Sequence, residues 1–417
     1  MTKIVDIEDI RKKREKKEIG IPIENINKKE LKRRGHEIGD ILGCDEKGEE
    51  ICVRKGKGNL YVDGNMEKEQ LFDFMRSQIY QNIQRGDSMV IVDLGSRIYK
   101  RELWIYLTIH GYRVDSYNMD CMTESDCFNC LDGLGAENEE QIVMIANDII
   151  DDQKYKFMTY PVETVCKALL SAVLLASLTE MEESDRNMLE IATIFRLGVS
   201  GTMLDKILHV MFEELDETSS AKQLFAMYSE AEEGIRMEAI QKIGNALAVY
   251  EKRANGSLCD NFRTNRYDME MPVKEKSVLF IESGQLPEDK VLFSVFMERL
   301  YDSMLKKAEE RQQDVTVMLL DYPYYGGLCG LEKYMEEGPE KGICTTLYED
   351  DRKLDGSGYA PHLVELYSLC DISVCIKDTE IPLCEIEKCE NPVTGECSKR
   401  KDCLLYTSPS PRDGATS

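Results

Sequence analysis

The spacing of apolar residues divides the chain into two kinds of region. Between residues 59 and 119, short apolar runs such as SMVIVDLG (88–95) alternate with longer segments such as 66–85, in which apolar residues recur every three or four positions. Continuous runs that end in Asp and Gly are typical of buried parallel strands, and the longer periodic segments are typical of amphipathic helices. Their alternation predicts βαβ units and therefore a mostly parallel sheet.

The pattern changes between residues 135 and 255. This stretch reads as five or six consecutive helices, including EQIVMIANDIIDD and VETVCKALLSAVLLASLTEM, and it contains one proline, Pro161. The strand pattern then resumes with SVLFIES (277–283), VTVMLLDY (315–322), GICTTLYE (342–349) and DISVCIKD. A helical domain inserted into an α/β domain is therefore predicted.

Three smaller features complete the pattern. EEICVRKG (49–56) and NLYVDG (59–64) both alternate apolar and polar residues, which predicts a hairpin between them. Trp104 and the methionines that recur at helical spacing are expected in the core. The last 14 residues (404–417) are polar and rich in Ser, Pro and Gly, and we interpret them as a sequencing or cloning artefact.

Charge is distributed unevenly along the 417 residues, whose net charge is −25. Residues 1–35 carry 12 Lys or Arg against 7 Asp or Glu, a local balance of +5, so the remainder carries −30. The acidic body argues against direct DNA binding. The basic leader fits either a solvated helix or an arm that touches acidic lipid headgroups or a nucleic acid.

The sequence shows neither a membrane span nor a secretory signal. Its longest apolar stretch, VCKALLSAVLLASL (165–178), contains Lys167 and is shorter than the roughly 18 residues that a span needs. The N-terminal residues are charged and lack an apolar centre. We therefore expect a cytoplasmic protein, at most peripheral to the inner face of the cell membrane, whose 15 cysteines are mainly reduced thiols.

The strand VTVMLLDY carries the best candidate for nucleotide chemistry. Apolar residues followed by Asp321 match the Walker B form, in which the Asp helps to hold a magnesium-bound water. A Glu that polarises the attacking water usually comes next. Here Tyr322 takes that place, and a phenol with a pKa of about 10 is a poor base at neutral pH.

The phosphate loop that would accompany such a strand is missing. The motif G-x-x-x-x-G-K-[ST] occurs nowhere, and the strand–helix junction where it would lie reads DGNMEKEQ (63–70). In that motif, backbone N–H groups and a Lys bind phosphates, and a Ser or Thr binds magnesium. Here Asp63, Glu67 and Glu69 would repel a triphosphate, and Lys68 is the only cation of the junction.

Cysteines near the C-terminal end form a candidate metal site. Four thiolates separated by four, seven and five residues could hold zinc tetrahedrally, namely Cys384, Cys389, Cys397 and Cys403. Standard zinc ribbons use C-x2-C pairs, so a set of free surface thiols is the alternative. Cys127 and Cys130 in CMTESDCFNC have the C-x-x-C spacing of metal or redox sites.

The order of these elements resembles the type IV secretion coupling proteins, the conjugative DNA-transfer ATPases. The resemblance runs from residue 28 to residue 376. Its matching segments are, in order, NKKELKRRG, GDILGCDEKGE, the stretch from SMVIVDLG to FNCL, KALLSAVLLASL, SVLFIESGQLPEDKVLFSVFMERLYDSML and VTVMLLDYPYYGGLCGLEKYM. The resemblance implies a RecA-like α/β core, of the kind found in P-loop NTPases, with an inserted all-α domain. It also implies hexamers at the cytoplasmic membrane that pass DNA or protein substrates to a secretion channel.

Several positions depart together from the family pattern. DGNMEKEQ replaces the phosphate loop, DLGSR (93–97) replaces DPKGE, the Glu after Asp321 is absent, and CTTLYEDD stands where a strand usually ends in Gln-Asn. The joint loss points to a degenerate member in which Asp321 is a vestigial Walker B residue. No cofactor is then expected, apart from zinc in the Cys-rich tail.

These observations define the predicted organisation. We expect a basic polar leader (1–45), a RecA-like core in two parts (46–130 and 261–380), an inserted all-helical domain (131–260) and a Cys-rich tail (381–403).

The predicted function is that of an inactive ATPase homologue, an interaction or regulatory subunit of a type IV secretion or conjugative DNA-transfer system. Its partners would be apparatus proteins, an intact coupling-protein paralogue, or further copies in a homo- or hetero-oligomeric ring. Two alternatives stay open. One is an active ATPase with an atypical site, in which Asp321 still ligates the magnesium of Mg-ATP. The other is an unrelated α/β scaffold with a zinc-binding tail.

Overall fold

The computed structural model describes most of the chain between Asp40 and Glu387. The described residues are 40–44, 50–53, 58–64, 68–93, 98–122, 125–151, 160–196, 201–254, 262–283, 289–320, 328, 330–349, 366, 369–376 and 384–387. The first 39 residues, most of the Cys-rich tail and the predicted artefact (404–417) lie outside them.

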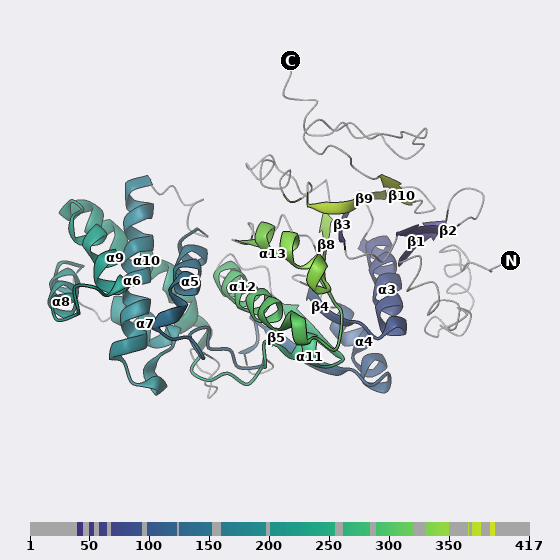
Figure 1. Ribbon diagram of the computed structural model, residues 1–417, viewed down its shortest axis with the longest axis horizontal. Helices are drawn as coiled ribbons and strands as arrows, with labels where there is room; N and C mark the ends of the chain where they lie inside the picture. Colours follow the sequence, from purple (N-terminus) through teal and green to yellow (C-terminus); the bar gives the residue numbers. More distant parts are fainter. Residues whose placement is uncertain are drawn as a thin grey trace, which may run out of the picture.

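An eight-stranded sheet forms the centre of the α/β part (Figure 1). The strands lie in the order β10 (Cys384–Glu387), β9 (Cys370–Ile376), β3 (Asn59–Gly64), β8 (Ile343–Glu349), β7 (Val315–Leu319), β4 (Ser88–Asp93), β6 (Ser277–Glu282) and β5 (Arg113–Asn118). Neighbouring strands run parallel, apart from the antiparallel pair β9–β10. The predicted mostly parallel sheet is confirmed.

Both faces of this sheet are covered by helices, because its central strands are apolar on both sides. All six residues of β4 and all six of β6 are buried. Helices α3 (Lys68–Arg85) and α4 (Ile98–Ile109) pack on the face that carries Ile91 and Phe280. Helices α12 (Asp289–Lys307) and α13 (Leu331–Glu337) pack on the opposite face, which carries Val92 and Ile281. A short helix, α11 (Met271–Lys274), precedes β6.

A helical domain is inserted between β5 and β6, as predicted, and lies at the left of Figure 1. Its helices are α5 (Glu139–Asp151), α6 (Tyr160–Glu180), α7 (Met188–Arg196), α8 (Gly201–Glu213), α9 (Ser220–Ser229) and α10 (Glu233–Ala254). Helix α6 is long and apolar enough to cross a membrane, but 72% of its most apolar window is buried inside the protein. It packs against α5, α9 and α10, so in this fold it is the core helix of the domain.

The predicted hairpin between residues 49–56 and 59–64 is wrong. β2 (Glu50–Val53) pairs instead with β1 (Asp40–Cys44) in a separate antiparallel sheet. β3 lies between β8 and β9 and runs parallel to both. The reason is that β3 is apolar on two sides: Val62 packs into the core beneath α3 and α4, and Tyr61 packs against the core of the other face.

The expectation that Trp104 lies in the core is also wrong. Tyr99, Leu103 and Leu107 form the side of α4 that rests on the sheet, and Trp104 is 40% exposed on another side of the helix. Several methionines at helical spacing are likewise exposed, among them Met203 and Met211 of α8.

Two buried carboxyl groups lie where the helical domain meets the core. Asp148 on α5 and Glu298 on α12 are both buried, and the two helices pack against each other (Figure 1). Burial raises the pKa of Glu298 well above its ordinary value, and the neighbouring Asp148 carboxyl adds to the rise. Glu298 therefore keeps a proton at neutral pH, which the unfolded chain would release.

Replacing Glu298 with Gln should weaken the dependence of stability on pH. In the wild type, the folded state binds one more proton than the unfolded chain above the ordinary carboxyl pKa of about 4.3. The free energy of unfolding therefore falls by up to about 1.4 kcal/mol per pH unit as the pH rises from that value. Glu298→Gln removes this proton, and we expect a shallower fall and at least wild-type stability at mildly alkaline pH.

Chemical denaturation across neutral and mildly alkaline pH measures this difference. Glu336→Gln, at an exposed position of α13, is the matched control and should keep the wild-type slope. A Glu298→Gln variant with an unchanged slope would show that the pair carries no extra proton.

Candidate functional site

The sheet topology places a candidate ligand site at the carboxyl end of β3. The chain leaves β3 through α3 toward β4, which lies beyond β8 and β7. It leaves β8 in the opposite direction, toward β9 on the far side of β3. In open α/β sheets, ligands bind outside the carboxyl ends of strands where the direction of the connections reverses. The junction DGNMEKEQ, which sequence reasoning identified, lies at this place.

The junction lacks the glycine spacing of a phosphate loop. β3 ends at Gly64 and Lys68 is the first described residue of α3, so three sequence positions (65–67) lie between them. The phosphate-loop motif needs six residues from its first to its second glycine, and after Gly64 the next glycine is Gly86. The register also places Asp63 opposite Glu349 at the ends of β3 and β8, so two acidic residues occupy adjacent strand ends.

An ion pair with a buried carboxylate lies at the same edge of the sheet, at the end of β6, which β8, β7 and β4 separate from β3. Glu282, the last residue of β6, accepts a hydrogen bond of 2.7 Å from Nζ of Lys100 on α4 and one of 3.0 Å from Oγ of Ser116. Asp93, the last residue of β4, accepts a long hydrogen bond of 3.5 Å from the backbone N–H of Tyr99. Lys100 is thus held against the sheet by an opposite charge, and α4 is anchored at its first turn.

A second ion pair joins the helical domain to this edge. Arg253, in the last turn of α10, donates through Nε to Oδ1 of Asp289 at 2.9 Å. Asp289 is the first residue of α12 and is buried, and its other oxygen accepts a hydrogen bond of 2.7 Å from Ser283, which follows β6. Nη2 of Arg253 also lies 3.6 Å from Oδ1 of Asp120, beyond the end of β5.

These contacts determine what the edge can do chemically. Lys100 and Arg253 are cations of the kind that could bind phosphate, but each is held by a buried carboxylate. Withdrawing either cation for a ligand would leave that carboxylate uncompensated, at a cost of several kcal/mol. The described part of the edge is therefore better suited to joining elements than to binding an anion.

The sequence-predicted site residues are only partly within the described structure. Asp321 follows Leu320 just after β7 and lies outside the described residues. Cys389, Cys397 and Cys403 also lie outside them, and Cys384 is described only as the first backbone position of β10. Zinc binding by these four thus stays a prediction. No group of three or more candidate metal ligands occurs among the described residues.

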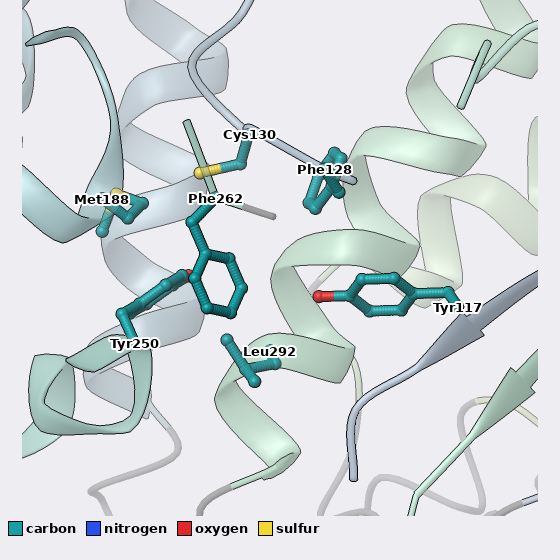
Figure 2. A pocket seen from close by; sticks show the side chains of 7 residues that line it. All are labelled: Tyr117, Phe128, Cys130, Met188, Tyr250, Phe262 and Leu292. Atoms are coloured by element: carbon teal, nitrogen blue, oxygen red, sulfur yellow. The ribbon is translucent and has the colours of Figure 1, made fainter. Parts of the chain in front are cut away.

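Cys127 and Cys130 are free thiols buried in the core. Burial raises the pKa of Cys130 to about 12, so this thiol is neutral at physiological pH and poorly suited to metal or redox chemistry. Figure 2 shows Cys130 in a small pocket, which is lined by Tyr117, Phe128, Cys130, Met188, Tyr250, Phe262 and Leu292.

This pocket lies between the core and the helical domain. Tyr117 and Leu292 come from β5 and α12, and Met188 and Tyr250 from α7 and α10. The Tyr117 hydroxyl points toward Phe262 (Figure 2) and has no hydrogen-bond partner, and burial raises the pKa of Tyr117. A lining of aromatic and apolar side chains without a cation fits the packing of two domains and does not fit a phosphate.

Sequence reasoning missed the two ion pairs, because their partners are far apart along the chain. Lys100 and Glu282 are separated by 182 positions, and Arg253 and Asp289 by 36. The one local signal was the acidic residue at the start of the helix DKVLFSVFMERL, a position where a carboxylate favours the helix dipole.

Removing Arg253 should destabilise the joint between the domains strongly. Arg253→Leu would leave Asp289 buried and uncompensated, so we expect a loss of about 3 kcal/mol in the free energy of unfolding. Arg196→Leu is the matched control. Arg196 pairs with Glu251, which lies on α10 like Arg253, but the Arg196 side chain is 71% exposed. The loss in the free energy of unfolding should therefore stay below about 1 kcal/mol. Denaturant titration measures both, and similar costs would contradict a special role for the Arg253 pair.

Comparison with known proteins gives a clear result for the fold. No protein-family model matches the chain, and no curated protein matches it. Among solved structures, the bacterial conjugative coupling protein TrwBdeltaN70 is 14% identical, with a TM-score of 0.55, and the match covers 84% of this chain and 75% of that one. The plasmid coupling protein TrwB in complex with ADP and Mg2+ is 13% identical, with a TM-score of 0.55, and the match covers 83% and 76%. The resemblance predicted from the sequence is thus confirmed at the level of the fold: the chain has the RecA-like fold of the coupling protein TrwB.

Proposed function

We propose that the chain is a coupling-protein-like component of a type IV secretion or conjugative DNA-transfer system, and that it acts through binding rather than ATP hydrolysis. The fold shared with TrwB over 84% of the chain supports the first part. The single observation that carries the second is the absence of the phosphate-loop motif where β3 leads into α3: after Gly64, at the end of β3, the next glycine is Gly86.

The loss of hydrolysis follows from three physical deficits. A triphosphate with Mg2+ needs backbone N–H groups that close around it, and the junction DGNMEKEQ (63–70) lacks the motif that forms such a cradle. It also needs a cation, and two described cations of the edge, Lys100 and Arg253, are already held by Glu282 and Asp289. Finally, the attacking water needs a base, and Tyr322 stands where the Glu is expected. TrwB, in contrast, has been solved with ADP and Mg2+ bound.

A protein with the fold of an ATPase but without hydrolysis would act by binding partners on its surface. We infer partners among the secretion or conjugation apparatus, with an intact coupling-protein paralogue or further copies in a ring as candidates. The negative charge of the body, −30 outside residues 1–35, argues against the protein as a direct DNA carrier. A position at the cytoplasmic face of the cell membrane would fit such partners.

The two alternatives make different predictions. An unrelated scaffold would lack a RecA-like sheet, whereas this chain has a parallel sheet with the fold of TrwB. An active ATPase with an atypical site would need Asp321 for magnesium. The effect of substituting Asp321 therefore separates the active ATPase from the proposal.

We expect Asp321→Asn to leave function intact. In a strain that carries the encoding element, deletion of the gene should lower transfer or secretion. Wild-type protein and Asp321→Asn should restore it to the same level, because no step depends on a magnesium-bound nucleotide. Immunoblots establish equal protein amounts. A deletion without effect would contradict the proposed role, and rescue by the wild type alone would favour the active ATPase.

A further inference from the structure

An apolar stripe on α8 faces the solvent. Met203, Ile207, Val210 and Met211 are 57%, 39%, 60% and 48% exposed, and their spacing places them on one side of the helix. The adjoining side, formed by Leu204, Leu208 and Phe212, is buried against the rest of the helical domain. Helix α8 therefore has two apolar sides, and the described residues cover one of them.

Helix α8 lies at the end of the helical domain that is farthest from the sheet (Figure 1). The stripe consists of side chains that suit contact with another helix: two flexible methionines adapt to different partner shapes, and Ile207 and Val210 give the stripe a fixed centre. A 13-residue helix presents more than three turns, enough for a partner helix to lie along it.

The surroundings of the stripe are acidic. Residues 201–238 contain 3 Lys or Arg and 9 Asp or Glu, a balance of −6. Two of the three cations are already paired, because Arg236 binds Asp205 and Lys222 binds Glu217. Exposed carboxylates lie at the C-terminal end of α8 and directly after it, at Glu213, Glu214, Asp216 and Glu217. The electric field around the stripe is therefore negative and favours a cationic partner.

We propose that this side of α8 is a docking site for a basic amphipathic helix of another protein. The apolar side of the partner helix would cover Met203, Ile207, Val210 and Met211, and its Lys and Arg residues would face the acidic rim. The same field repels nucleic acids and anionic lipid. A symmetric contact with α8 of a second copy would bring two acidic rims together. The proposal goes beyond the proposed function and does not depend on it, because it involves no nucleotide.

The test uses the full chain and a synthetic probe. The probe is a fluorescent 18-residue Lys/Leu peptide that forms an amphipathic helix, and its control is a scrambled peptide of the same composition. Fluorescence anisotropy should show saturable binding of the probe, and binding of the scrambled peptide at least about tenfold weaker. Ile207→Ser combined with Met211→Ser should weaken probe binding at least about tenfold.

Matched controls keep the result interpretable. Ile105→Ser with Ile109→Ser changes two residues of α4 that are 71% and 76% exposed, and this variant should bind the probe like the wild type. All four positions are exposed, so both double variants should fold, which circular dichroism checks.

Three results would overturn the proposal. The first is absence of saturable binding, or equal binding of the probe and the scrambled peptide, since the attraction would then be charge alone. The second is an equal loss in the α4 and α8 variants. The third is self-association of the wild type that only the α8 variant abolishes, which would show that a second copy covers the stripe.

Discussion

The structure depends on the burial of both sides of its central strands. β4 and β6 have no exposed position, so the sheet needs helices on each face. Helices α3 and α4 satisfy one face, and α12 and α13 satisfy the other. Parallel strands must also be joined by crossovers, and the direction of these crossovers reverses between β3 and β8. The reversal at β3 is what creates a candidate ligand site.

The described residues at this edge of the sheet hold elements of the fold together. Where a phosphate loop would close around a ligand, the junction between β3 and α3 lacks the phosphate-loop motif. Where cations could meet phosphates, Lys100 fastens α4 to β6, and Arg253 fastens the helical domain to α12. The carboxyl edge of the sheet thus joins α4 to β6 and the helical domain to α12. Binding to partners is therefore better sought on the surfaces of the helical domain.

The sequence predicted those elements whose apolar residues form a clear pattern over a short stretch of the chain. SMVIVD and SVLFIE are continuous apolar runs, and both are fully buried strands. β8 has a weaker pattern because Thr345 and Thr346 interrupt it, yet it lies beside β3 near the centre of the sheet. Its polar groups find distant partners: the Thr345 N–H donates to Asn59, and its hydroxyl hydrogen-bonds Tyr301. Such pairings, like those of Arg253 and Lys100, arise from tertiary packing and leave no mark on local spacing.

The two wrong predictions have the same cause, because local spacing does not show which elements pack together. The hairpin of residues 49–56 and 59–64 failed because alternation identifies a strand and not its partner. The expected burial of Trp104 failed because a helix with two apolar sides can place either one on the sheet. The sequence singled out the junction after β3, and the topology places the reversal of connections at the same strand. The role of Asp321 and the loss of catalytic residues stay predictions. Asp321 and three of the four tail cysteines lie outside the described residues.

The most direct test of the account is titration calorimetry of the full chain with Mg-ATP, at low and at physiological salt. We expect no saturable heat up to millimolar nucleotide, because the β3–α3 junction lacks the phosphate-loop motif and the described cations Lys100 and Arg253 are each paired with a carboxylate. Saturable binding that weakens on Asp321→Ala would contradict it, and would show that other residues hold the phosphates at this edge.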